Sequence, residues 1–131
     1  VVSGHILTFE NPIEFVFQHK KSVVNQREIG FDTVSLELAL KNAMRQSPDV
    51  IFIGEIRDQE TMSAALGYAQ SGHLCLATLH ANNSHHALNR ILGFYPAQAR
   101  EAVQRDLSLS LKAMLSQRLI RTSPSHRCNE T

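Results

Sequence analysis

Three stretches of the chain have the β-prone, apolar composition of buried strands. The middle stretch is an apolar block that is too short for a buried helix and is ended by Gly54. The three predicted strands are His5–Phe9, Val50–Ile53 and His73–Leu79. Two further stretches, Phe15–Phe17 and Val23–Asn25, flank a basic turn and are also expected to be short strands.

Between these strands, apolar residues recur with the spacing of amphipathic helices. The predicted helices begin at Ser35, at Asp58, at Asn82 or Asn83, and at about Gln98. Gly72 stops the second helix, Pro96 breaks the third, and the fourth is expected to run to Leu119. The positions expected to face the core are Leu36, Ala39, Leu40, Ala43 and Met44, then Met62, Ala65, Leu66 and Ala69, then Ala87, Leu88, Ile91 and Leu92.

Strands that alternate with helices of this length predict an α/β fold with a mainly parallel sheet. The chain has 131 residues, 43% of them apolar, which suits one domain with a buried core. It starts at Val1 and a strand follows almost at once, so we expect a piece of a longer protein. Residues 122–131 lose all periodicity, and we expect a disordered or non-native tail after a domain of residues 1–121.

Composition argues against several classes of function. The net charge of +1 gives no electrostatic reason to expect binding to nucleic acid or to an anionic membrane. No apolar stretch approaches the roughly 20 residues that span a bilayer. Cys75 lies in a predicted strand and Cys128 in the polar tail, so the two give neither a disulfide framework nor the spacing of a zinc site. This usage of cysteine is compatible with a reducing cytosol.

A polar cluster follows each of the three predicted strands. The clusters are Glu10–Glu14, Glu55–Asp58 and His80–Asn83. Parallel strands place their carboxyl ends at one edge of the sheet, where ligands bind in open α/β folds, so the clusters are expected to converge there. The alternative is that they are solvated charges at strand ends that come together by chance.

The clusters contain parts that suit the hydrolysis of a phosphoanhydride. This reaction needs a carboxylate for a metal ion, a group that positions water, and cations that oppose the developing charge. Glu55 suits magnesium, held through a bound water, and Glu14 suits the attacking water. No G-x-x-x-x-G-K-[ST] phosphate loop occurs in the chain. We therefore expect this loop upstream of Val1, or else a protein that does not bind nucleotide in this way.

The same clusters resemble the ordered motifs of one family. Thr8–Glu14 resembles an aspartate box, T-x-E-D-P-I-E, and Arg45–Asp58 resembles a Walker B signature, R-x-x-P-D-x-x-x-x-G-E-x-R-D. Gly72–His80 resembles a histidine box, G-H-L-x-x-x-T-L-H. Over residues 4–120 the chain thus resembles the hexameric RecA-like motor ATPases of type II secretion and type IV pili. The resemblance implies part of a RecA-like P-loop NTPase core that uses ATP and Mg²⁺.

Within this family the chain resembles the retraction branch, the PilT and PilU twitching-motility ATPases. Ser116–Leu119 is followed by a single Cys128 instead of the four-cysteine zinc module of secretion and extension motors. Arg90–Pro96 is similar to the R-I-x-x-F-F/Y-P run of retraction motors, and Ala81–Asn83 and Asp106–Lys112 look closer to PilU than to PilT. The alternatives left open are a type II secretion or pilus-assembly ATPase and a non-catalytic accessory ring subunit.

The resemblance also implies roles for single residues. The expected catalytic residues are Glu14, Glu55 and His80, with Glu55 as the acid beside magnesium. The residues expected to contact the nucleotide or its neighbours are Glu10, Asn11, Arg57 and His73. Two of these have a structural alternative: Glu10 can cap backbone amides, and His73, at the start of a strand, can be a satisfied structural histidine.

Two positions depart from the family pattern. Asn11 stands where the family has aspartate, which keeps the shape, loses the charge and adds an NH₂ donor. This change is expected to lower activity if the aspartate holds magnesium or orients Glu14. Phe52 replaces an aliphatic residue of the Walker B strand, where only local repacking is expected.

The resemblance implies partners and a place of action as well. The intact protein is expected to form a homo-hexamer, or a mixed hexamer with a paralogous retraction ATPase. It is expected to act in the cytoplasm, at the inner face of the cytoplasmic membrane, on an inner-membrane pilus platform protein, and to bind no nucleic acid. The chain alone, without a phosphate loop, is expected to be inactive as an ATPase.

Overall fold

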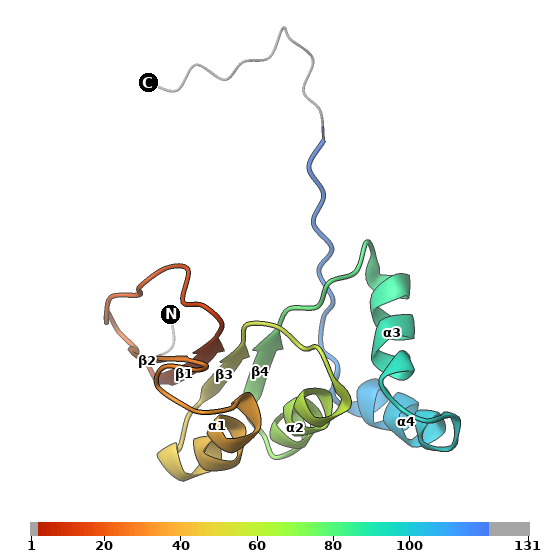
Figure 1. The fold of residues 1–131 in the computed structure, drawn as a ribbon, viewed down its shortest axis with the longest axis horizontal. Coiled ribbons are helices and arrows are strands. Elements are labelled where there is room, and N and C mark those ends of the chain that lie inside the picture. The colour runs from red at the N-terminus through yellow and green to blue at the C-terminus, as the bar shows by residue number, and fades with distance from the viewer. Residues whose placement is uncertain (1–2, 121–131) are drawn as a thin grey trace, which may run out of the picture.

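The computed structural model describes residues 3–120 and contains one sheet of four parallel strands (Figure 1). The strands are β1 (His5–Glu10), β2 (Val23–Glu28), β3 (Val50–Ile53) and β4 (Leu74–Ala77), in the order β2-β1-β3-β4. The predicted α/β class and mainly parallel sheet are therefore confirmed. The third predicted strand is shorter than expected, because His73 and residues 78 and 79 lie outside the ladder.

The stretch between β1 and β2 differs from the prediction. Val23 does begin a strand, but Phe15–Phe17 forms none, so that expectation was wrong. Since β2 runs parallel to β1, the residues between them must return the chain to the other end of the sheet. Residues 11–22 make this return as a loop. The backbone of Phe15 and Phe17 bonds to the side chain of Gln26 instead of to a neighbouring strand.

Helix α1 (Leu36–Ala43) and helix α2 (Gln59–Gln70) begin where the sequence predicts. The Ser35 hydroxyl accepts a hydrogen bond from the amide of Leu38, and the Asp58 carboxylate accepts one from the amide of Thr61, so each satisfies a free donor of a first turn. Helix α1 continues into the 3₁₀ turn η1 (Met44–Gln46). Gly72, with φ +94°, follows the end of α2 in a conformation that glycine adopts without cost.

Helix α3 (Ser84–Gly93) is capped by Asn83, which is one of the two caps that the sequence predicted. After the 3₁₀ turn η2 (Ala97–Ala99), helix α4 (Arg100–Ser110) is much shorter than the predicted helix to Leu119. Residues 111–120 have no helix or strand, and Leu115 is 95% exposed. A helix in water needs an apolar surface to pack on, and this segment has none among the described residues.

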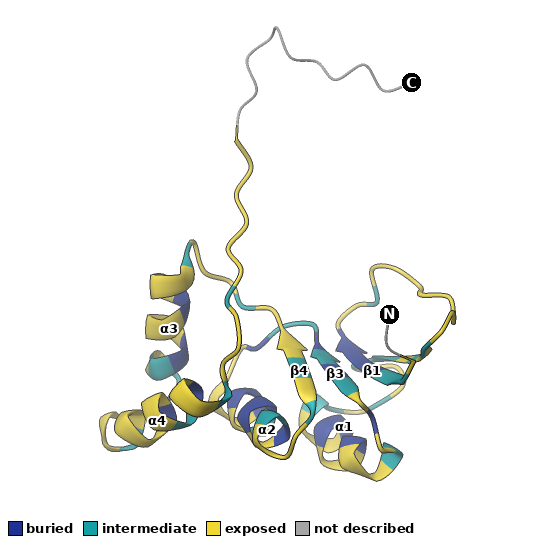
Figure 2. Ribbon diagram, turned by 180° about the vertical axis from the view of Figure 1, so that it is seen from behind, coloured by how far each residue is buried: buried dark blue, intermediate teal, exposed yellow. Residues whose placement is uncertain are grey.

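The hydrophobic core lies between the sheet and one layer of helices (Figure 2). Leu7 and Phe9 of β1 and Ile51 and Ile53 of β3 are at most 1% exposed on this side. Most of the predicted helix positions join them, but the expectation was wrong for Met44, which is 41% exposed, and for Leu88, which is 37% exposed, and Ala69 is only partly buried. Tyr68 is buried instead, and its hydroxyl donates to the carbonyl of Leu40, which ties α2 to α1.

Cys75 in β4 is not set up to react. Burial raises the pKa of its thiol to about 11, so little of the reactive thiolate is present at neutral pH. Within residues 3–120, no helix has the length and apolar character needed to cross a membrane. The predicted tail, residues 122–131, lies outside the described residues.

Candidate active site at the carboxyl edge of the sheet

The carboxyl ends of β1, β3 and β4 lie side by side, as the sequence predicts. Phe9 pairs with Ile53, and Ile53 pairs with Ala77, so the next residues of the three strands are direct neighbours. The amide of Gly54 donates to the carbonyl of Phe9 at 2.8 Å, and the amide of Ile56 donates to the carbonyl of Thr78 at 3.0 Å. These bonds continue the order of the sheet into the loops that carry the polar clusters.

Gly54 is the point of closest approach between the first and second clusters. A Cβ atom placed on Gly54 would lie 3.0 Å from the carbonyl oxygen of Phe9 and 3.3 Å from the Cα atom of Glu10. Both atoms belong to backbone that is fixed by the sheet, so neither can move aside easily. The absence of a side chain at Gly54 thus lets the loop that carries Glu55 pack against the end of β1.

Replacing Gly54 by alanine is expected to destabilise the protein by about 1–3 kcal/mol, because the added methyl overpacks the end of β1. The matched control is Gly67→Ala in helix α2, where a Cβ atom meets nothing within 4 Å. That change should stabilise by about 0.5–1 kcal/mol, since glycine is a poor helix residue. Urea unfolding followed by circular dichroism measures both. A Gly54→Ala variant as stable as the parent would contradict the close packing.

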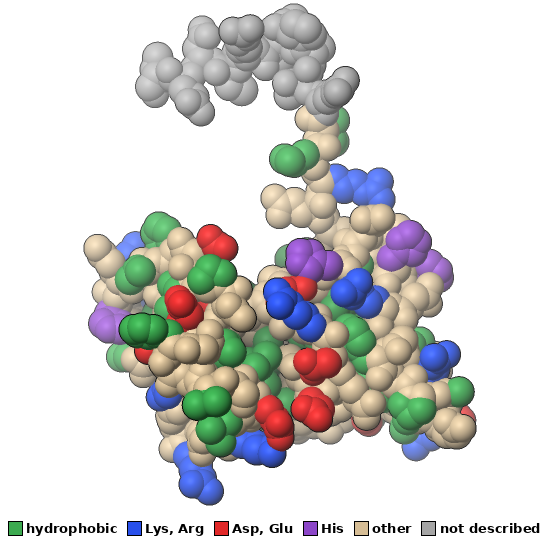
Figure 3. Space-filling view, in the orientation of Figure 1, with side chains coloured by type: hydrophobic (Ala, Val, Ile, Leu, Met, Phe, Trp, Pro, Cys, Tyr) green, Lys and Arg blue, Asp and Glu red, His purple; other side chains and the backbone are tan. Residues whose placement is uncertain are grey.

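Glu55 is the centre of the edge. Its carboxylate accepts from the Arg57 guanidinium, with Nε at 2.5 Å from Oε2, and contacts His80, with Nε2 at 3.1 Å from Oε1. The side chain of Glu55 is only 18% exposed, whereas those of Arg57 and His80 are 65% and 79% exposed. The structure therefore brings together three of the predicted site residues. Figure 3 shows basic, histidine and acidic side chains gathered near the middle of this face.

The surroundings of Glu55 bear on how it would hold magnesium. Its Oε2 accepts from Arg57 and its Oε1 lies against Nε2 of His80, and no group of three or more metal-ligating side chains occurs among residues 3–120. Mg²⁺ keeps several waters in proteins and is often held by one or two carboxylates together with phosphate oxygens. One partly buried carboxylate that acts through water fits this chemistry, and an all-protein cage does not.

Glu10 lies at the end of β1, and its carboxylate bonds to residues of β1 and β2. Its side chain is buried, and its Oε1 accepts from the Thr8 hydroxyl at 2.6 Å and from the Gln26 amide at 3.0 Å. Thr8 and Gln26 are paired across β1 and β2, so these bonds hold Glu10 over the β2 side of the sheet. These bonds fit the alternative in which Glu10 has a structural role. Its partners are side chains, however, and not the backbone amides that the sequence suggested.

Asn11 and Glu14 lie in the loop that follows β1, where a cis peptide bond joins Asn11 to Pro12. Both residues are exposed. The loop is fixed at Ile13, whose amide donates to the Glu28 carboxylate at 3.1 Å. Among the described residues, none hydrogen-bonds or pairs with the carboxylate of Glu14. That carboxylate is thus available to a ligand or to water.

His73 is the predicted site residue that the structure separates from the others. It precedes β4, whereas His80 follows it, so the two histidines lie at opposite edges of the sheet. The ring of His73 contacts the Tyr68 ring edge-on at 6.3 Å, and its Nδ1 lies 3.3 Å from the Ser71 hydroxyl. These contacts fit the structural alternative weighed for His73.

Sequence reasoning missed three residues at this edge. The Thr78 hydroxyl donates to the carbonyl of Gly54 and joins the loops after β3 and β4. Gln26 joins Glu10 to the loop that carries Glu14. Arg118 donates to the carbonyl of Asn82 at 3.3 Å, which brings residues 111–120 to the third cluster. Only Thr78 had a signal, its place in the histidine-box motif two residues before His80.

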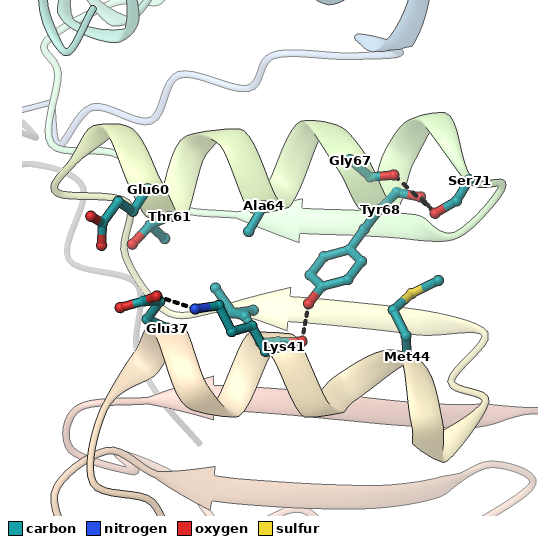
Figure 4. Close-up of a pocket in the computed structure, with 10 residues that line it drawn as sticks. Glu37, Lys41, Met44, Glu60, Thr61, Ala64, Gly67, Tyr68 and Ser71 are labelled. Carbon is teal, nitrogen blue, oxygen red and sulfur yellow. Dashed lines mark hydrogen bonds and ion pairs between the residues drawn. The ribbon is translucent and has the colours of Figure 1, made fainter.

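An open groove of about 470 Å³ lies elsewhere, between helices α1 and α2 (Figure 4). Figure 4 shows Tyr68 reaching across it to α1, and the ion pair between Glu37 and Lys41 near one end. None of the predicted site residues lines this groove. Its position gives it no part in the chemistry of the carboxyl edge.

The model of the type II/IV secretion system protein family matches residues 2–131. The chain belongs to this family. It is 56% identical over 120 residues to the type IV pilus ATPase PilU of Pseudomonas aeruginosa, covering 92% of this chain and 31% of that protein. It is 45% identical to the type IV pilus retraction ATPase PilT of the same organism, covering 89% of this chain and 34% of PilT. The chain thus spans about a third of the length of these relatives.

The structural comparison agrees. The solved structure of the pilus retraction motor PilT with bound ADP matches with a TM-score of 0.85 and 51% identity, over 90% of this chain and 34% of that one. The expected RecA-like α/β fold is therefore confirmed, as is the resemblance to the PilT and PilU branch. Identity to the pilus assembly ATPase PilB of Pseudomonas aeruginosa is lower, at 39%.

Proposed function

We propose that the full-length protein that contains this chain is a type IV pilus retraction ATPase, which couples ATP hydrolysis to the extraction of pilin. The observation that carries the proposal is the carboxyl edge, where Glu55 is held between Arg57 and His80 within a domain 56% identical to PilU. A strand-end carboxylate of this kind suits a metal-assisted phosphoryl transfer.

In this proposal each residue of the edge has a defined task. Glu55 would hold Mg²⁺ through a water molecule, and the ion would supply positive charge against the phosphates of ATP. Glu14 orients and deprotonates the attacking water, and His80 responds to the terminal phosphate through its contact with Glu55. Arg57 fixes the Glu55 carboxylate. Glu10 and Asn11 shape the start of the Glu14 loop, and His73 lies at the other edge of the sheet.

The proposal extends to the assembly. The protein forms a hexameric ring, from one kind of subunit or together with a paralogous retraction ATPase, and works in the cytoplasm at the inner face of the membrane on a pilus platform protein. Support comes from the likeness to the type IV pilus ATPase PilU and to the pilus retraction motor PilT. A type II secretion or assembly motor is the second candidate, with 35% identity to the type II secretion system protein E of Xanthomonas campestris.

The test is ATP turnover by the purified full-length protein, with and without magnesium. We expect magnesium-dependent hydrolysis by the full-length protein and none by residues 1–131 alone, because this segment has no phosphate loop. Hydrolysis by the isolated segment would show that the site works without the rest of the protein, against the proposal. In cells, loss of the gene should leave pili assembled but unable to retract; loss of pilus assembly would favour the second candidate.

Asn11 allows a prediction about the rival class, a non-catalytic ring subunit. In the full-length protein, Asn11→Asp restores the carboxylate of the family motif beside Glu14. If the protein is an ATPase, we expect turnover to stay measurable or to rise, and adding Glu14→Gln should remove it. If the parent protein and Asn11→Asp both stay at the background of a buffer control, the non-catalytic reading holds instead.

A further inference from the structure

The side chain of Gln26 joins three parts of the molecule that the sequence keeps apart. Its Oε1 accepts a hydrogen bond from the amide of Phe17 at 2.7 Å. Its Nε2 donates to the carbonyl of Phe15 at 2.8 Å and to the Glu10 carboxylate at 3.0 Å. A glutamine amide has one oxygen that accepts and one NH₂ group that donates twice, and here each has a matching partner. The orientation of the amide is therefore fixed by its surroundings.

These three bonds clamp the loop that carries Glu14. Gln26 lies in β2, directly across from Thr8 in β1, so its backbone is held by the parallel ladder. The two loop residues that it holds, Phe15 and Phe17, stand one and three positions after Glu14. Through Gln26, the loop is attached to a strand on one side and to the buried carboxylate of Glu10 on the other.

Apolar burial gives this loop little support. The side chains of Phe15 and Phe17 are 68% and 48% exposed, and their main aromatic contact is with each other, at 5.4 Å between ring centres. Polar ties therefore carry much of the work of fixing it. Besides Gln26, these include the bond from the amide of Ile13 to Glu28 and the bond from the amide of Val24 to His19. Of these, only the Gln26 ties reach the loop just after Glu14.

We propose that Gln26 is a positioning residue for Glu14. This rests on the proposed function, in which Glu14 orients the attacking water. Gln26 does not touch the reacting atoms; it fixes the backbone from which the Glu14 side chain projects. A displacement of about 1 Å in a reacting group can cost about a hundredfold in rate, so a looser loop lowers the chemical step more than it lowers binding.

Two substitutions at Gln26 separate its bonds. Gln26→Met keeps most of the volume and removes all three hydrogen bonds. Gln26→Glu keeps an acceptor for the amide of Phe17 but places a carboxylate against the Glu10 carboxylate and the Phe15 carbonyl, where two donors stood. Gln104 in helix α4 is exposed, and Gln104→Met and Gln104→Glu are the matched controls.

The experiment uses the full-length protein and two measurements. Steady-state kinetics should show that kcat for ATP falls about 10- to 100-fold in Gln26→Met and Gln26→Glu, while KM changes less than about threefold. Hydrogen exchange should show faster exchange in residues 13–19 and unchanged exchange in β1 and β3. The Gln104 variants should match the parent protein in both measurements.

The outcomes are distinct. Unchanged exchange in residues 13–19 would overturn the clamp. Faster exchange there with unchanged kcat would overturn the positioning role. A rise in KM equal to the fall in kcat/KM would also count against it, since that pattern indicates lost binding. Parent protein without ATP turnover would instead defeat the proposed function, and the exchange measurement would still decide whether Gln26 clamps the loop.

Discussion

Replacing Glu14 by glutamine in the full-length protein is expected to lower ATP turnover by about 10²–10⁴-fold, the range in which a positioned general base contributes. The substitution keeps the size of the side chain and removes its ability to take a proton. Because Glu14 is exposed and no described residue pairs with its carboxylate, the fold should not change. Phosphate release measures turnover, and fluorescent ATP analogues measure binding, which should stay within about threefold.

The control for this prediction is Glu101→Gln, which removes an exposed carboxylate from the first turn of helix α4. It should leave turnover within about twofold, since a surface charge at a helix end affects only stability, by a few tenths of a kcal/mol. Full activity in Glu14→Gln would remove Glu14 from the mechanism. It would also leave the Gln26 clamp without a catalytic purpose.

The second large effect concerns the core below the site. Phe9→Ala is expected to destabilise the protein by about 3–5 kcal/mol, because Phe9 is 1% exposed and its loss leaves a cavity between β1 and the helices. With a typical urea slope of about 1–3 kcal/mol/M, the unfolding midpoint of the domain should fall by about 1 M or more. Circular dichroism during urea titration gives this midpoint.

Phe31→Ala is the matched control, because it removes the same side-chain atoms from a residue that is 87% exposed. It should shift the unfolding free energy by no more than about 0.5 kcal/mol. Equal effects of the two substitutions would mean that the face beneath helices α1 and α2 is not the core of this domain.

The sequence was sufficient for the parts of the fold that follow from local chemistry. Ser35, Asp58 and Asn83 are polar residues directly before apolar helical stripes, and all three cap helices in the structure. The apolar block at Val50–Ile53 could only be a buried strand. Once these strands are parallel, their carboxyl ends share an edge, so the meeting of Glu55 with His80 was predictable.

The parts that failed depend on contacts between distant segments. Nothing local distinguishes Phe15–Phe17 from a strand; the parallel pairing of β1 and β2 makes it a loop. Likewise, the helical pattern of residues 111–119 is real, but the segment lacks a surface to pack on among the described residues, and α4 ends at Ser110. The role of Gln26 was out of reach for the same reason, because it depends on the register that sets Gln26 opposite Thr8.

His73 shows a different limit. A motif such as G-H-L-x-x-x-T-L-H places two histidines close together in sequence, and it is natural to assign both to one site. Since β4 runs between them, the strand carries them to opposite edges of the sheet. The spacing of residues in a motif therefore shows at which edge of the sheet each residue lies only when the start and end of the strand are known.

The most direct test of the central claim is a structure of the full-length protein with Mg²⁺ and a non-hydrolysable ATP analogue. We expect the terminal phosphate and the metal ion at the carboxyl edge of the sheet, with Glu55 bonded to a water of the metal and Glu14 facing the terminal phosphate. Nucleotide bound at the opposite edge beside His73, or in the groove between helices α1 and α2, would contradict the claim.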